Sequence, residues 1–555
     1  MVLRFANWCL QPALVGAFTL ALTVIAAAQI PSPIPTPTPD QPVVQRTFRR
    51  PLPPMPDSTR TGVTAGDELS LTMDQAIEMA LRNNNDIDVS RNDVHIAAFN
   101  FEAAKGIYDP LVNSQTYYES RTTPTASVIG GTTNDSITQR QIYGDLGLSG
   151  FVPKFGGAYD VIFNSARTDT TSRNATLNPQ FPSNFTATFT QPLLRNRSID
   201  LNRRNIMIAR KNIDISDAQL QQKAMDIIAR VEQAYWDLAY ALRNLQVQLE
   251  SLTQAREQFE SNQRQVEKGA LAPVDVVAAQ QQVSNFEQLV YLAQETVTRT
   301  ENTLKTLVLA DRTSAEWSRP LMPVSPVELT VPHMPLDTAQ AEALKNRPEL
   351  QQLETSAEIN KIDERFFRNQ TKPQVDLVGS YTSAGLAGTR NPISPGMPPP
   401  SLVGGYFDSL GRLVSLDFPT YRAGLQISFP LRNRTAKAIL ARTLEEGSRI
   451  ENQQAQAEEN IEAEVRNTLQ SLRSAESRLA SATDARLAAE ELYNSEQRQF
   501  RGGTSTFFLV LQRQTALAVA RASELNARTI LNKAISDFNR ALGRTLTVNN
   551  VSVSP

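Results

Sequence analysis

The chain is poor in the side chains that build metal sites and disulfides. Its 555 residues include one cysteine, Cys9, and two histidines, His95 and His333. Metal sites that use these ligands are therefore nearly excluded, and we expect no metal and no cofactor. The sequence also lacks a nucleophile elbow and a glycine-rich phosphate loop, so we expect no enzyme activity.

Excess charge and long hydrophobic runs are scarce as well. The formal net charge of -2 gives no reason to expect a nucleic-acid partner. The mean hydropathy of -0.32 is too polar for a bundle of membrane-spanning helices. The composition is otherwise ordinary, with 41% hydrophobic and 20% charged residues, and the chain is long enough for large folded elements.

The N-terminus carries the one long apolar run. It follows Arg4, extends from Leu10 to Ala27 and ends in small residues, which predicts a secretory signal peptide over residues 1–28. The alternative is an N-terminal anchor helix, for which the run is short. Because Cys9 precedes the run, the mature chain would have no cysteine. Residues 29–66 form a proline-rich periplasmic linker, a semi-rigid tether, with a ligand for a proline-reading module as the alternative.

Two short sequences occur twice. Residues 80–83 (ALRN) return as 343–346 (ALKN), and residues 194–197 (LRNR) return as 431–434. A duplicated helix–strand–helix unit behind a secretion signal implies a repeated element that cannot close its surface alone. This organisation favours transport over catalysis. The mature chain then divides into a first repeat (67–310), a linker (311–335), a second repeat (336–546) and a tail (547–555).

Long heptad patterns dominate both repeats. Residues 199–267 contain neither proline nor glycine, which predicts about 100 Å of continuous helix. Apolar residues at alternating steps of three and four predict two coiled-coil hairpins, 199–309 and 434–542, each broken once by a glycine turn. Shorter helices are expected at 74–81, 87–105, 337–345 and 348–369.

Period-two alternation marks two strand regions, about 109–192 and about 374–430. The candidate strands are residues 111–120, 141–151, 158–168, 184–192, 374–383 and 421–430. A short turn at one end and long Thr-, Ser-, Asn- and Gly-rich loops at the other are typical of transmembrane barrel hairpins. A soluble sandwich would show the same alternation and stays open as an alternative.

Several segments together carry a resemblance to a known family. They are the repeats 71–85 and 336–347, the strand-to-helix junctions 189–195 and 429–432, and the hairpin tips 266–276 and 499–504. In this order and spacing, residues 69 to 546 resemble the TolC-like outer-membrane efflux (outer-membrane factor) family. Each motif alone is of low specificity.

The resemblance implies a fold and a function. The fold is an α+β membrane protein, a homotrimer whose outer-membrane β-barrel is continuous with a long periplasmic α-helical barrel. The function is a passive exit channel of a tripartite system that docks a periplasmic adaptor and an inner-membrane pump for efflux of small molecules. The location is the outer membrane of a Gram-negative-type bacterium, in contact with its lipid. The alternatives are the exit channel of a type I protein secretion system and a non-conducting periplasmic coiled-coil scaffold.

The resemblance also places candidate site residues at the hairpin tips. The implied adaptor-docking residues are Lys268, Gly269, Ala270, Leu271, Arg501, Gly502, Gly503 and Thr504. The implied pore constriction contains Asp275, while Phe508 and Leu511 occupy positions that are often acidic in the family. A more apolar constriction would gate partly by dewetting. Alternatively, Phe508 and Leu511 pack in the coiled-coil seam.

The strand count departs from the family pattern. The family has four strands per protomer and twelve in the trimer, whereas six candidate strands would give eighteen and a wider pore. We expect four spanning strands plus an accessory hairpin at 141–168, because a wider barrel would have to taper sharply onto the same helices. The resemblance implies that the inner-membrane pump sets most of the cargo choice, so the sequence does not reveal the transported substrate.

Overall fold

The computed structural model describes residues 52, 54–57, 60–64, 66–126, 135–311, 313–325 and 330–553. The predicted signal peptide and most of the proline-rich linker lie outside the described residues. The folded unit begins at Met55.

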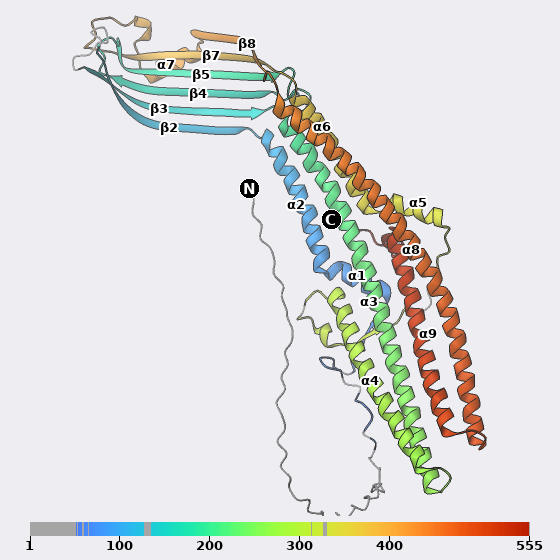
Figure 1. The fold of residues 1–555 in the computed structure, drawn as a ribbon. Helices are drawn as coiled ribbons and strands as arrows, with labels where there is room; N and C mark the ends of the chain where they lie inside the picture. The colour runs from blue at the N-terminus through green and yellow to red at the C-terminus, as the bar shows by residue number, and fades with distance from the viewer. Residues whose placement is uncertain are drawn as a thin grey trace, which may run out of the picture. The chain divides into compact units, whose positions relative to one another are not determined.

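Two sets of helices share the same order and nearly the same lengths (Figure 1). The first set is α1 (Met73–Asn83), α2 (Asn85–Lys105), α3 (Leu201–Glu267) and α4 (Pro273–Val308). The second set is α5 (Leu336–Asn346), α6 (Pro348–Gln370), α8 (Arg434–Arg501) and α9 (Phe507–Ala541). The predicted long helices, hairpin turns and shorter helices are therefore confirmed. Over the described residues, every helix is too short or too polar to cross a membrane.

The strands extend beyond the ends of the helices to which they connect (Figure 1). They are β2 (Leu111–Pro124), β3 (Ser136–Phe151), β4 (Ala158–Thr170), β5 (Leu177–Pro192), β7 (Gln374–Arg390) and β8 (Phe418–Ser428). They form one antiparallel sheet in the order β2-β3-β4-β5-β7-β8. All six predicted strands are confirmed, and most are longer than expected.

The hairpin expected to be accessory is part of the same sheet as the other four strands, while the number of strands that span the membrane stays a prediction. The hairpin β3–β4 lies inside the sheet, where β3 pairs with all of β2 and β4 pairs with β5. If it were removed from this sheet, β2 would lose the partner of every residue from Leu111 to Pro124. Backbone N–H and C=O groups need such partners, which favours continuous pairing over a detached hairpin.

The repeated LRNR segment makes the turn from strand to helix in both halves. Asn196 and Asn433 have φ values of 67° and 42°, a left-handed conformation that asparagine tolerates better than most residues. The Asn196 side chain accepts a hydrogen bond from Gln370 Nε2 at 2.7 Å, and the Asn433 side chain donates one to the Thr371 carbonyl at 3.0 Å. The sequence repeat therefore encodes a repeated backbone turn.

The ALRN and ALKN repeat has a packing role. Ala76 and Ala80 of α1, and Ala339 and Ala343 of α5, are all fully buried. Their small side chains let α1 lie against α3 and let α5 lie against α8. A short helix therefore packs against each of α3 and α8 in the same way in the two halves.

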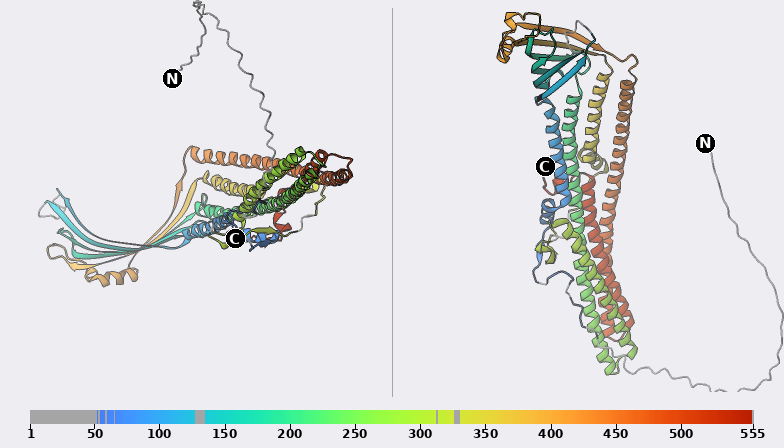
Figure 2. Two further views of the ribbon diagram at one scale, coloured as in Figure 1. Left: turned by 90° about the horizontal axis from the view of Figure 1, so that it is seen from below. Right: turned by 90° about the vertical axis from the view of Figure 1, so that its left-hand side faces the viewer.

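The long helices pack in antiparallel pairs, α3 with α4 and α8 with α9, and α3 also contacts α9 (Figure 2). Several predicted seam residues of α3, including Val231, Tyr235, Leu238 and Leu252, are fully buried. The next ones, Leu242 and Leu245, are only partly covered and pack against the core. The seam of α3 therefore contains fully buried residues and residues that stay partly exposed.

The segment predicted as a linker contributes to the first half. Within it, β6 (Leu321–Pro323) pairs in parallel with β1 (Leu69–Leu71). Tyr235 lies beneath this small sheet, where its hydroxyl donates to the Leu71 carbonyl at 3.0 Å and accepts from the Ser325 N–H at 2.9 Å. The chain end also packs here, through Leu546, Val551 and Val553.

We predict that Tyr235→Phe lowers the free energy of unfolding by about 1–3 kcal/mol, because the half-buried Ser325 N–H loses its partner and the buried Leu71 carbonyl loses one of two partners. Thermal unfolding followed by circular dichroism measures the change. Tyr291→Phe is the control, since Tyr291 is exposed on α4. Equal midpoints for the two variants would contradict the proposed role of the Tyr235 hydroxyl.

Candidate functional site

The two hairpin tips have the same hydrogen-bonded geometry. At the first tip, Gly269 has a φ of 76°, and the Ala270 N–H donates to the Gln265 carbonyl at 2.8 Å. At the second tip, Gly503 has a φ of 75°, and the Thr504 N–H donates to the Gln499 carbonyl at 3.0 Å. This is the Schellman ending of a helix, which requires a residue at positive φ. Glycine satisfies that requirement in both halves.

The tip residues are open to solvent in one copy of the chain. Lys268, Gly269 and Ala270 at the first tip are exposed, as are Arg501 through Thr504 at the second, and Leu271 is half-buried. The structure thus places the residues predicted to dock an adaptor on two equivalent exposed turns. Contact with a partner stays a prediction for all of them.

The predicted constriction residues begin the helices that return from the tips. Asp275 is in the first turn of α4, where a carboxylate interacts favourably with the helix dipole. Phe508 is near the start of α9 and is 72% exposed, and Leu511 follows one turn later and is half-buried. Gln282 of α4 donates to Thr515 of α9 at 3.2 Å. Asp275 lies seven residues before Gln282, and Phe508 lies seven residues before Thr515. Both residues are therefore about two helical turns nearer to the tips than the Gln282–Thr515 hydrogen bond.

The alternative that Phe508 packs in the coiled-coil seam is wrong. Phe507 and Val510 occupy the seam instead, at 3% and 2% exposure, and the Phe507 ring lies 6.1 Å from that of Phe500. The sequence signal for this packing is the three-four-three spacing of Phe507, Val510, Gln514 and Leu517, which are all buried. Phe508, the neighbour of a seam residue, is therefore directed away from the helix pair.

Ion pairs hold the second hairpin together above its tip. Arg486 of α8 forms an ion pair with Glu524 of α9 at 2.7 Å, and Arg521 of α9 forms one with Glu490 of α8 at 3.2 Å. The hydrogen bond to Glu524 raises the pKa of Arg486. Closer to the tip, burial raises the pKa of Tyr493. These cross-links fix the spacing of the two helices that carry the tip.

The sheet has one apolar and one polar face. Residues opposite each other in an antiparallel register share a face, so each row can be followed across all six strands. One row consists of Val112, Leu148, Val161, Ala187, Tyr381 and Tyr421. The row on the other face, one residue further along, consists of Asn113, Gly147, Ile162, Thr186, Thr382 and Thr420. In the neighbouring rows the contrast holds on β3, β4 and β5, with Leu146, Phe163 and Phe185 on the first face and Asp145, Asn164 and Asn184 on the second.

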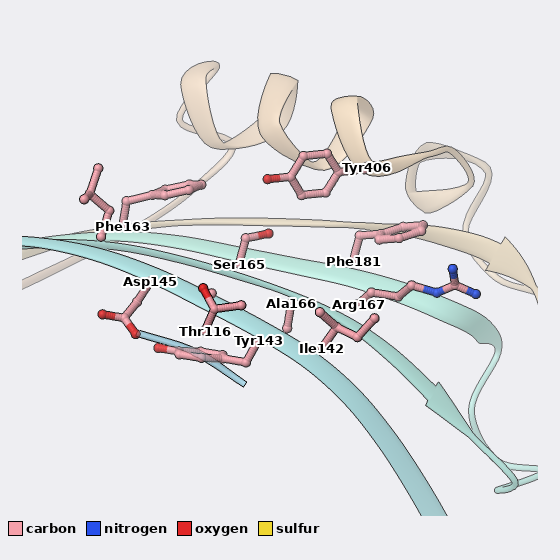
Figure 3. A pocket seen from close by; sticks show the side chains of 12 residues that line it. Thr116, Ile142, Tyr143, Asp145, Phe163, Ser165, Ala166, Arg167, Phe181 and Tyr406 are labelled. Atoms are coloured by element: carbon pink, nitrogen blue, oxygen red, sulfur yellow. The ribbon is translucent and has the colours of Figure 1, made fainter. Parts of the chain in front are cut away.

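A short helix lies on the apolar face near the loop ends of the strands. It is α7 (Tyr406–Val414), in the loop between β7 and β8, and it was not expected from the sequence. Ser409 of α7 shares a 2.7 Å hydrogen bond with Ser183 of β5. A pocket opens beside α7, with Tyr406 on one side and Phe163, Ser165 and Phe181 of the strands on the other (Figure 3).

Among the described residues, no cluster of three or more His, Cys, Asp or Glu side chains could hold a metal ion. The functional surfaces are instead extended: two sheet faces, two exposed tips and the helix starts above them.

Comparisons with known proteins agree with this picture. The family model described as "Outer membrane efflux protein" matches residues 136–308 and 340–544, about two thirds of the chain. No curated protein sequence is significantly similar to the chain.

Solved channel structures share the fold at low sequence identity. The outer-membrane channel OprN is 18% identical with a TM-score of 0.61, over 88% of this chain and 95% of that one. The CmeC outer membrane channel of Campylobacter jejuni is 14% identical with a TM-score of 0.60, over 85% and 86%. The MtrE outer membrane channel of Neisseria gonorrhoeae is 15% identical with a TM-score of 0.56, over 89% and 98%.

We predict that Gly503→Ala destabilises the second tip by about 1 kcal/mol, because alanine at a φ of 75° is strained although no atom lies within 4 Å of its Cβ. Gly502→Ala is the matched control. Gly502 has an ordinary helical φ, and its Cβ would meet only the Gln499 and Arg498 carbonyls at 3.5 and 3.6 Å. Hydrogen exchange of the tip amides measures the effect, and equal exchange in both variants would contradict it.

Proposed function

The chain belongs to the outer membrane efflux protein family, and we propose on this basis that it is the outer-membrane channel of a tripartite export system for small molecules. It is an outer-membrane protein with a large periplasmic portion. We further propose that residues 1–28 are removed on export and that residues 29–66 tether the mature N-terminus in the periplasm.

The observation that carries this proposal is a two-faced sheet with open edges, joined to duplicated coiled-coil hairpins. An apolar face suits lipid and a polar face suits a water-filled lumen. The edge strands β2 and β8 are exposed along their whole lengths in one copy. Because unpaired backbone groups cannot face lipid, these edges need strands from other copies.

The directions of the edge strands allow such closure. Strand β2 runs away from α2, whereas β8 runs toward α8. Strand β8 of one copy can therefore pair antiparallel with β2 of the next, all the way round a ring. We propose that three copies close the ring, as the family resemblance implies, and that their hairpins form the periplasmic α-helical barrel.

The tips supply the proposed contact with the rest of the export system. Their exposed turns lie at the ends of the hairpins away from the sheet (Figure 1). A periplasmic adaptor would dock there and connect the channel to an inner-membrane pump, which would supply the energy and select the cargo. Asp275, Phe508 and Leu511 would line the constriction just above the tips.

We predict that the purified trimer produces discrete conductance steps in a planar bilayer, and that Asp275→Asn lowers the permeability ratio of cation to anion. Removing a carboxylate from a narrow mouth removes an attraction for cations. Asp337→Asn is the control, since Asp337 is also an acid in a helix first turn, but on α5. An absence of conductance steps would contradict the channel function and favour the non-conducting scaffold. Unchanged selectivity of the Asp275 variant would show only that Asp275 does not line the constriction.

We also predict that Lys268→Glu combined with Arg501→Glu weakens adaptor docking by about tenfold, which is ~1.4 kcal/mol, because both charges lie on exposed tips. Export of a fluorescent dye from cells should fall while bilayer conductance stays unchanged. Lys361→Glu, an exposed site on α6, is the control. Unimpaired dye export by the double variant would argue against docking through these residues.

A further inference from the structure

The sheet has six strands, two more than the family resemblance implies, and β3–β4 is the hairpin that connects to no helix. We propose that it spans the outer membrane with the other four strands, so that three copies close a barrel of eighteen strands instead of twelve. This inference rests on the proposed trimeric channel. It gives the hairpin a specific environment, with lipid on one face and the lumen on the other.

The apolar face continues through the hairpin in two consecutive rows. Leu148 of β3 and Val161 of β4 stand between Val112 of β2 and Ala187 of β5 in one row. In the next row on the same face, Leu146 and Phe163 precede Phe185 of β5. A hairpin that lay in water would have no need for apolar side chains at the depths where its neighbours carry them.

The opposite face of the hairpin is polar. Asp145 of β3 and Asn164 of β4 are directly opposite each other in the register. Asn164 in turn accepts a hydrogen bond of 3.1 Å from Asn184 of β5. Asp160 lies on the same face, opposite Ser149. Both added strands therefore continue the polar surface of β5 that would line the lumen.

The hairpin is also long enough. Strands β3 and β4 contain 16 and 13 residues, beside 14 in β2 and 16 in β5. A transmembrane strand needs about 9–11 residues. Both strands pair with their neighbours over nearly their whole lengths, so they cover the same depth as the strands that connect to helices.

The objection that a wider barrel must taper onto the same helices is answered by the turn at residues 152–157. The turn continues into no helix and instead rests on the start of α3. Gln191 of β5 donates to the Phe155 carbonyl at 2.9 Å, and a Cβ on Gly156, at a φ of 69°, would lie 2.9 Å from the carboxylate of Asp200, the N-cap of α3. The hairpin thus widens the sheet without adding a connection between the sheet and the helices.

The consequence is a wider mouth on the outer side. At equal strand tilt, barrel diameter grows roughly in proportion to strand number, so eighteen strands give about 1.5 times the diameter of twelve. The added wall would line the lumen with carboxylates and amides. The helical barrel below would keep the circumference that its own helices set.

The first experiment compares two neighbouring residues on β4. Val161→Arg places a charge on the apolar face, and Ile162→Arg places the same charge one residue further, on the polar face. We expect Val161→Arg to reduce the yield of assembled trimer in the outer membrane by tenfold or more, and Ile162→Arg to assemble normally. Normal assembly of both variants would overturn the proposal.

A second measurement avoids disruptive substitutions. Cys9 is the sole cysteine, so single cysteines at positions 160 to 163 can be introduced after Cys9→Ala. We expect a fluorophore at 161 and 163 to be quenched by nitroxide-labelled lipid, and cysteines at 160 and 162 to react with a membrane-impermeant maleimide. Reaction of all four positions with the maleimide would overturn the proposal.

Conductance separates this inference from the proposed function. A variant lacking residues 136–170 keeps β2 and β5 antiparallel, and it should conduct less than the intact chain. Equal conductance of the two proteins would show that the hairpin is not part of the barrel wall. No conductance from the intact chain would instead contradict the channel, whatever the labelling pattern of β4.

Discussion

The structure depends on one constraint: the backbone hydrogen-bonding groups at the two edges of the sheet must find partners where water is absent. Edge strands β2 and β8 present whole rows of such groups in a single copy. In hydrocarbon each unsatisfied group costs several kcal/mol, so an open sheet of this kind cannot be a finished membrane structure. Copies that share edges remove the cost. In the proposed trimer, assembly would therefore complete the fold.

The duplicated helices make that assembly regular. Helices α3 and α8 differ by one residue in length, and each is entered through an asparagine at positive φ. The two halves are tied by polar contacts, such as Lys533 to Asp237 at 2.9 Å. A protomer thus contributes two similar wall segments with similar tips. Three protomers would present six, a nearly even ring built from one sequence.

Much of this could be predicted from the sequence, because long helices and alternating strands leave periodic signals. The heptads between residues 199 and 267 and the six alternating segments all became elements of the expected type. Pairing order leaves no such signal, which is why the sequence does not place the hairpin β3–β4 inside the sheet. Helix α7 has nine residues in a loop rich in glycine and proline, too few for a periodic pattern. Among the candidate site residues, Phe508 was hard to place because an adjacent phenylalanine, Phe507, takes the seam position.

Strand parity explains why an enlarged sheet remains compatible with the same helices. Closure by antiparallel pairing requires the first and last strands of a copy to run in opposite directions, and adding a hairpin preserves that relation while adding one strand would destroy it. Inserting the hairpin between β2 and β5 also leaves the connections to α2, α3, α6 and α8 in place. Barrel width can therefore change in steps of two strands per copy without a change in the helical wall. The turn at Gly156, which lies close to Asp200 and Arg203 at the start of α3, connects β3 to β4 without continuing into a helix.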